Sequence, residues 1–258
     1  SDIDAAATAN WNSYTGFDPI GYYDTNKSFL DLDQETFNGK FDGLGHSISN
    51  LKIASFYQGI GLFAITSDTA LIQNIGLGNL DYSGYATTGG LVGLNRGTIN
   101  NAYVSSGTVT GNNSMYGGLV GWNTNSGKIS NSYANATVKG LYSSHDNMGG
   151  LVGYNDGLVE SSFATGSVSG RNYIGGLVGG TSGIVRNSYA TGTVNGTQSV
   201  GGLVGFNGGV VDQSYSSGAV SGNTFIGGLI GNNEYGTAKS SFWNTDTSGM
   251  STSAGGTA

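Results

Sequence analysis

The chain has 258 residues, of which only 10% are charged, and its formal net charge is −7. Its nine Lys and Arg residues are scattered, whereas a nucleic-acid-binding surface needs a basic cluster. There is no cysteine and no apolar run long enough to span a bilayer. We therefore expect no disulfide, no nucleic acid partner and no membrane insertion by this segment.

Residues 1–88 contain irregular copies of a pattern that becomes regular later. Residues 48–53 and 72–77 align with residues 185–190, and residues 61–64 align with a recurring Gly-Leu-Val-Gly. The acidic residues Asp31, Asp33, Glu35 and Asp42 are concentrated in this part of the chain. We expect residues 1–88 to form degenerate N-terminal coils.

The sequence Gly-Gly-Leu-Val-Gly then starts five times, at Gly89, Gly117, Gly149, Gly175 and Gly201, and returns as Gly-Gly-Leu-Ile-Gly at Gly227. The last three intervals between these starts are 26 residues each, and the first two are 28 and 32. Such self-similarity is typical of a repeat architecture. It predicts regular coils over residues 89–236 and a degenerate last coil and tail over residues 237–258.

Each unit carries the same residue types in the same order. An Asn, replaced once by Thr181, follows the Gly-Gly-Leu-Val-Gly, and a β-branched residue, an aromatic residue and a Thr/Ser-Gly-Thr/Ser-Val stretch come next. These are short runs of alternating polarity separated by turn residues, which indicates strands. Helices are disfavoured because each of the 48 glycines would cost about 1 kcal/mol relative to Ala inside one.

The repeats predict an all-β single domain, a right-handed parallel β-helix of about eight coils with three short strands per coil. The right-handed sense comes from the chirality of strand crossovers. We expect the Leu residues, the β-branched residues, the aromatic residues and the Val residues to form inward columns, and the Asn residues to form a hydrogen-bonded ladder. Glu160, Arg186, Asp212 and Lys239 should form an outward row of alternating charge.

One coil is longer than the others. Four extra residues lie between Val138 and Met148, and insertions in solenoids emerge as loops that often bind partners. Tyr142, His145 and Asp146 in this insertion are the candidate receptor-binding residues, although a plain solvent-exposed loop explains them too.

Three parts of the chain resemble segments of bacterial surface proteins. Residues 175–196 look like the GLUG repeat. Residues 2–51, with Trp11-Asn and Phe37-Asn-Gly-Lys-Phe-Asp-Gly43, are similar to the segment that leads into such repeats in filamentous-haemagglutinin-like adhesins, and residues 240–257 resemble the segment that follows them. The resemblance implies an exported β-helical stalk at the bacterial cell surface with a role in attachment, without catalytic residues or a cofactor. It also implies a monomeric piece of a longer protein and a host or surface receptor, with a glycan as one candidate.

Two other functions stay open. Asp31 and Asp33 alternate with Leu32 and could serve a polysaccharide-cleaving β-helix, since such enzymes need converging carboxylates. The two histidines, His46 and His145, lack the further ligands of a zinc site. Ice binding would use an outward hydroxyl face of Thr165, Ser167, Thr191, Thr193 and Ser217, although Asn135 and Ala219 interrupt the row.

Overall fold

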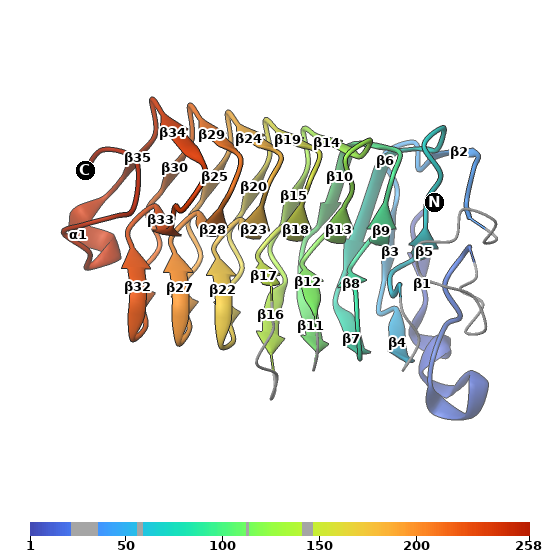
Figure 1. The fold of residues 1–258 in the computed structure, drawn as a ribbon. Helices are drawn as coiled ribbons and strands as arrows, with labels where there is room; N and C mark the ends of the chain where they lie inside the picture. The colour runs from blue at the N-terminus through green and yellow to red at the C-terminus, as the bar shows by residue number, and fades with distance from the viewer. Residues whose placement is uncertain (22–35, 56–58, 112–113, 141–146) are drawn as a thin grey trace.

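The computed structural model describes residues 1–21, 36–55, 59–111, 114–140 and 147–258. The chain winds into a parallel β-solenoid, and strands of successive turns lie side by side along its length, with the two termini near opposite ends (Figure 1). Two of the four sheets contain seven strands each, one from each turn. The described part thus has about seven turns, close to the expected eight.

A regular turn contains five short strands. In residues 152–175 these are β18 (Val152–Asn155), β19 (Leu158–Glu160), β20 (Phe163–Ala164), β21 (Val168–Ser169) and β22 (Asn172–Gly175). The expectation of three strands per coil is corrected here, because backbone corners divide the runs. Ser161, with φ of 49°, separates β19 from β20, and a bend at Gly166 separates β20 from β21.

The later turns repeat this order. They contain β23 (Val178–Thr181), β24 (Ile184–Arg186), β25 (Tyr189–Ala190), β26 (Val194–Asn195), β27 (Gln198–Gly201), β28 (Val204–Asn207), β29 (Val210–Asp212), β30 (Tyr215–Ser216), β31 (Val220–Ser221), β32 (Thr224–Gly227), β33 (Ile230–Asn232), β34 (Thr237–Lys239) and β35 (Phe242–Trp243). A short helix, α1 (Thr245–Ser248), follows.

The earlier turns have the same parallel pairing, and β6 and β10 are longer than their later counterparts. They contain β5 (Phe63–Ile65), β6 (Leu71–Gly78), β7 (Leu80–Gly84), β8 (Thr88–Gly89), β9 (Val92–Asn95), β10 (Thr98–Val104), β11 (Gly107–Gly111), β12 (Met115–Gly117), β13 (Val120–Asn123), β14 (Lys128–Ser130), β15 (Tyr133–Ala134), β16 (Thr137–Gly140) and β17 (Asn147–Gly149). The N-terminal end adds β1 (Ile3–Asp4), β2 (Lys40–Asp42), β3 (Ser47–Ser49), β4 (Lys52–Ser55) and two 3-10 helices (Ala6–Asn10 and Asn12–Tyr14).

The N-terminal turn has a different register from the one its sequence indicates. Phe41 pairs with Ile72, and Ile48 pairs with Leu77, so the alignment of residues 48–53 with 72–77 was wrong. A turn at Leu44 and Gly45, both with positive φ, lengthens the earlier segment. The alignment of residues 61–64 is confirmed.

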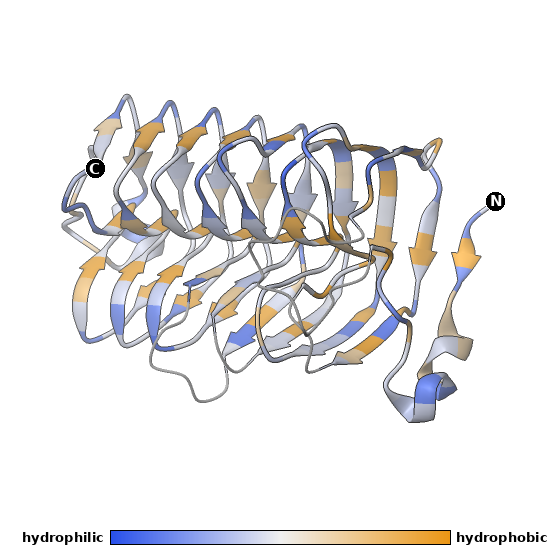
Figure 2. Cartoon of the chain, turned by 45° about the vertical axis from the view of Figure 1, so that its right-hand side comes forward, coloured by the Kyte–Doolittle hydropathy of each residue, from blue (hydrophilic) through white to orange (hydrophobic). Residues whose placement is uncertain are grey.

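The core consists of columns of equivalent apolar residues. The Leu column is buried throughout, and the Leu177 N–H donates to Leu203 O at 2.9 Å while Leu177 O accepts from the Leu151 N–H at 2.9 Å. The β-branched and Val columns are buried as well. Figure 2 shows the hydrophobic residues recurring at matching places in successive turns. The predicted 26-residue register is therefore confirmed in the regular part.

The aromatic column faces outward, which corrects the inward position expected for it. Phe163 is half-buried, whereas the next residue, Ala164, is fully buried. In an uninterrupted strand Phe163 would share the inward face of Val159. The left-handed residue at Ser161 shifts this alternation by one position, so Ser162 and Ala164 point inward and the ring points out.

The C-terminal end is closed by residues larger than those of the regular turns. Trp243, 8% exposed, occupies the inward position that Ala164 and Ala190 hold in earlier turns. Asn244 caps α1, and its side chain accepts hydrogen bonds from two backbone N–H groups. Across the described ranges, every helix is too short or too polar to cross a bilayer.

Candidate functional site

The most distinctive surface feature is a stack of aromatic rings, which we call the aromatic column. Its members are Tyr103, Tyr133, Phe163, Tyr189 and Tyr215, one from each of five successive turns. Neighbouring ring centroids lie 4.8–5.0 Å apart, and the ring planes are within 6° of parallel. Each inner ring thus has both faces covered. Desolvation raises the pKa of Tyr133 and Tyr189, and a nearby tyrosine, Tyr103 for the former and Tyr215 for the latter, raises it further.

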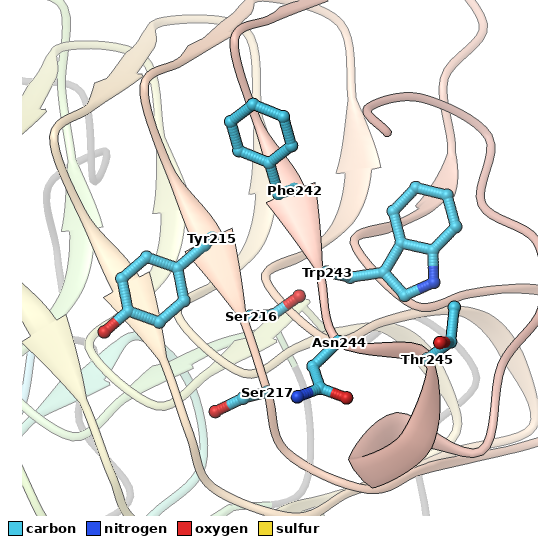
Figure 3. A pocket seen from close by; sticks show the side chains of 7 residues that line it. All are labelled: Tyr215, Ser216, Ser217, Phe242, Trp243, Asn244 and Thr245. Carbon is cyan, nitrogen blue, oxygen red and sulfur yellow. The ribbon is translucent and has the colours of Figure 1, made fainter. Parts of the chain in front are cut away.

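The aromatic column ends at Tyr215. Phe242 pairs with Tyr215 in the backbone ladder, yet Figure 3 shows its ring turned away from the Tyr215 ring. The two side chains are 45% and 51% exposed. Between them lies an open pocket of about 540 Å³, which we call the end pocket, lined by Tyr215, Ser216, Ser217, Phe242, Trp243, Asn244 and Thr245.

Several polar groups around the end pocket already have partners. Trp243 Nε1 donates to Met250 O at 3.0 Å, and Ser216 Oγ donates to Gly228 O at 2.7 Å. Asn244 Oδ1 accepts from the first turn of α1.

Other groups of the lining stay available. Tyr215 OH, Ser217 Oγ, Thr245 Oγ1 and Asn244 Nδ2 form no hydrogen bond within the described part of the chain. None of the described lining residues is charged. The pocket therefore offers the aromatic side chains of Tyr215, Phe242 and Trp243 with neutral donors and acceptors beside them.

The predicted receptor-binding residues Tyr142, His145 and Asp146 lie outside the described residues, as do Asp31, Asp33 and Glu35. The fourth acidic residue of the N-terminal part, Asp42, is exposed and structural. Gln73 Nε2 and Asn74 Nδ2 donate to its carboxylate at 2.7 and 3.0 Å, and these bonds lower its pKa. The N-terminal acidic cluster therefore has one described member, which holds neighbouring turns together.

The hydroxyl row of the ice-binding hypothesis lies along a corner of the solenoid. Thr165, Ser167, Thr191 and Thr193 are exposed, and Ser217 is half-buried. The strands on the two sides of this row, such as β20 and β21, belong to different sheets. The structure confirms that these residues point outward and places them at a bend between sheets; ice binding itself stays a prediction.

The charge row has the predicted register, and one of its pairs is in contact. Glu160, Arg186, Asp212 and Lys239 are consecutive partners in one ladder. Arg186 donates to Glu160 Oε2 from Nε at 2.9 Å and from its terminal nitrogen at 2.6 Å. The described residues show no ion pair between Arg186 and Asp212. Because these side chains are solvated, the row contributes little to stability.

The predicted asparagine ladder exists inside the solenoid. Asn95 Nδ2 donates to Asn123 Oδ1 at 2.8 Å, and Asn123 Nδ2 donates to Asn155 Oδ1 at 2.8 Å. Thr181 ends this run by accepting from Asn155 Nδ2 at 3.1 Å. All four side chains are fully buried, so the amides satisfy one another away from water.

A buried serine column was missed by the sequence analysis. In consecutive turns, the N–H groups of Ser132, Ser162, Ser188 and Ser214 donate to the Oγ of the serine one turn later, each at 3.2 Å. Each Oγ in turn donates to a carbonyl two residues before it in its own chain. The signal was available, because a Ser precedes the aromatic residue in four successive repeats.

His46 contacts the first residues of the chain. Its Nδ1 lies 3.6 Å from Asp2 Oδ1, and its Nε2 lies 3.3 Å from the amino group of Ser1. Within the described ranges, no three His, Cys, Asp or Glu residues are grouped closely enough to hold a metal ion. These contacts join the two residues before β1 to the turn at residues 43–46.

Comparison with known proteins identifies similar repeats elsewhere. Residues 112–139, 145–169 and 170–195 match the family model of the GLUG motif. Over 124 residues the chain is 40% identical to halomucin of Haloquadratum walsbyi. The aligned segment makes up 47% of this chain and 1% of halomucin. No solved structure matches the chain. The matches support the assignment of these residues as repeats of the GLUG type.

Proposed function

We propose that the chain is a non-enzymatic module of an extracellular surface protein, a stiff spacer that also attaches to a surface glycan or protein receptor. The observation that carries this proposal is the continuity of the columns. The aromatic column passes through five turns. Four serine hydrogen bonds each join one turn to the following turn, and buried Asn side chains also bond from turn to turn.

These columns favour a mechanical role. Successive described turns are joined by backbone ladders, and side-chain columns add further links between Asn95 and Ser241. Solenoids stack such units in one dimension. Seven turns at roughly 4.8 Å each give a rod of about 34 Å. A rod of this kind suits a protein that holds a binding surface away from a cell.

The distribution of charged groups supports a non-enzymatic role. Glycoside hydrolysis needs two carboxyl groups within about 5–10 Å on one face. Among the described repeats, Glu160 is bonded to Arg186, and the carboxylate of Asp156 accepts from Trp122 Nε1 and Ser182 Oγ. Asp212 alternates with Arg186 and Lys239 in the charge row, so these carboxylates are held among donors or bases.

The relationship to surface proteins supports the location and the attachment role. GLUG motifs and the similarity to halomucin fit an extracellular repeat protein, and the filamentous-haemagglutinin-like resemblance of the flanking segments adds attachment to it. The chain spans about 1% of the halomucin sequence, so the activity of any larger protein is part of the same proposal.

The test is a combined binding and turnover assay. The chain is applied to a glycan array and incubated with soluble polysaccharides, and bound protein and newly released sugar ends are both measured. We expect binding without product release. Product release by the purified chain, or no retention on any glycan or surface protein, would contradict the proposal.

A deletion variant locates the attachment site. Deleting residues 142–145 shortens the connection from β16 to β17 to the length found between β21 and β22. Loss of binding in this variant, with an unchanged circular dichroism spectrum, would assign attachment to the insertion. Retained binding would assign it to the solenoid itself.

A further inference from the structure

We propose that the end pocket binds a pyranose ring of a glycan, which stacks on the open face of Tyr215 and continues the aromatic column by one ring. The inference rests on the proposed attachment function and gives it a site and a ligand class. Nothing in the GLUG repeat itself identifies this pocket, because residues 215–245 lie beyond the matched segments.

The spacing of the aromatic column defines the position of a further ring. The solenoid rise sets the ring spacing of 4.8–5.0 Å, so the position for a sixth ring lies one such step beyond Tyr215. The next turn supplies Phe242 at the matching backbone position, but its side chain points elsewhere (Figure 3). The end pocket therefore occupies the place of a missing ring.

The turn that closes the site is held by packing and by hydrogen bonds. Trp243 packs against Gly228, where any added Cβ would lie 2.0 Å from the indole Cδ1, and its Nε1 is bonded to Met250 O. Asn244 is fixed by its bonds to α1. The wall opposite Tyr215 is thus held in place before any ligand arrives, and preorganisation of this kind lowers the cost of binding.

The lining of the end pocket matches the chemical groups of a pyranose ring. A pyranose ring has an apolar C–H face and a rim of hydroxyl groups. The Tyr215 face can cover the former, and Ser217 Oγ, Thr245 Oγ1 and Asn244 Nδ2 can bond to the latter. Small-molecule sites combine apolar walls with a few polar groups in this way, in volumes of about 300–1,000 Å³.

Other ligands fit less well. No described lining residue carries a charge that would recognise a phosphate, a carboxylate or an amine. An aromatic side chain of a peptide could stack on Tyr215, but it would leave the neighbouring hydroxyl and amide groups without partners, which is unfavourable once they are desolvated. Because the site is shallow and holds a single ring, we expect a dissociation constant near 1 mM for a monosaccharide.

The experiment titrates methyl glycosides of glucose, galactose, mannose and N-acetylglucosamine into the ¹⁵N-labelled chain. The chain contains three tryptophans, and Trp243 alone lines the end pocket. We expect at least one glycoside to shift the indole N–H signal of Trp243 and to leave those of Trp11 and Trp122 in place. This readout needs no variant and does not depend on how a variant folds.

Variants then identify the stacking face. Tyr215→Ala should weaken the glycoside response at least tenfold, Tyr215→Phe should retain stacking with a change of threefold or less, and Ser217→Ala should weaken it about threefold. Tyr235→Ala is the matched control, because Tyr235 is 77% exposed near the same end of the chain and does not line the pocket. It should bind as the wild type does.

Three results would overturn the inference. They are no shift of the Trp243 signal with any glycoside, an unchanged response in Tyr215→Ala, and tighter binding of N-acetyltryptophanamide than of every glycoside. A different result distinguishes the end pocket from the proposed attachment function. Array binding that survives Tyr215→Ala but is lost with residues 142–145 would overturn the end pocket and leave the proposed attachment function standing.

Discussion

At the scale of single residues, the corners of the turns depend on side chains that replace missing backbone partners. Ser188 Oγ accepts from the Ser162 N–H at 3.2 Å and donates to Arg186 O at 2.7 Å. Both ends of this bridge lie where the ladder is interrupted by a left-handed residue, Ser161 in one turn and Asn187 in the next. A two-atom hydroxyl thus bonds two turns at a place where strands cannot pair.

Ser188→Ala should therefore destabilise the chain by about 1–3 kcal/mol, because it leaves the buried Ser162 N–H without an acceptor. Urea unfolding followed by circular dichroism measures this change. Thr191→Ala, three residues away and exposed, is the control and should change the free energy of unfolding by less than about 0.5 kcal/mol. Equal effects of the two substitutions would show that the serine column does not stabilise the corners.

Tyr82 gives a pH dependence of known sign. It is buried in the core, and burial raises its pKa well above the ordinary value of 10. A group whose folded pKa is raised contributes stability that is present below its unfolded pKa and lost above it. The free energy of unfolding should therefore fall as the pH rises above 10, by about 1.4 kcal/mol per pH unit from this group.

Tyr82→Phe removes the ionisable hydroxyl, which has no hydrogen-bond partner among the described residues. Urea unfolding at pH 9, 10 and 11 should show a shallower alkaline loss of stability in this variant than in the wild type. Parallel pH profiles would mean that Tyr82 reaches solvent when it ionises.

At the scale of elements, the stacking columns could be predicted better than their orientation. Residues such as Leu177 recur every 26 positions, so their vertical partners follow from the sequence. The outward position of the aromatic column could not be found by counting alternate residues, because a left-handed corner shifts the phase. That corner is formed by Asn, Ser and Gln in different turns, and this variety hides the shared backbone conformation.

The candidate site followed even less from the sequence. The orientation of Phe242 depends on the final turn and α1, which have no repeat counterpart from which a position could be inferred. The predicted register of the N-terminal turn was wrong for a related reason. One extended turn shifts the pairing, so that Ile48 pairs with Leu77. Irregular ends lack the periodicity that carries the prediction elsewhere.

The interruption of the asparagine ladder also belongs to this scale. Thr181 accepts from Asn155 Nδ2, but within the described residues its side chain makes no bond to Asn207. Thr181→Asn should supply an amide that continues the chain of bonds and should raise stability by about 1 kcal/mol. The reverse exchange, Asn155→Thr, should lower it. Thermal unfolding of both variants checks the pair, and a destabilised Thr181→Asn would show that the turn has no room for a longer side chain.

At the scale of the whole molecule, we expect each turn to be an exchangeable unit and the end pocket to depend only on the final turns. Repeat proteins have stability that is approximately a sum over units and their interfaces. Deleting residues 178–203 removes one period and joins Leu177 to Val204. Phe163 would then stack on Tyr215, and Asn155 would meet Asn207 because Thr181 is gone.

The most direct test is therefore the ¹H–¹⁵N spectrum of this deletion variant with and without the glycoside that the full chain binds. We expect a dispersed spectrum of a folded protein and the same shift of the Trp243 indole signal as in the full chain. A collapsed spectrum would contradict the exchangeable turn, and a folded variant without the Trp243 response would contradict a binding site confined to the last turns.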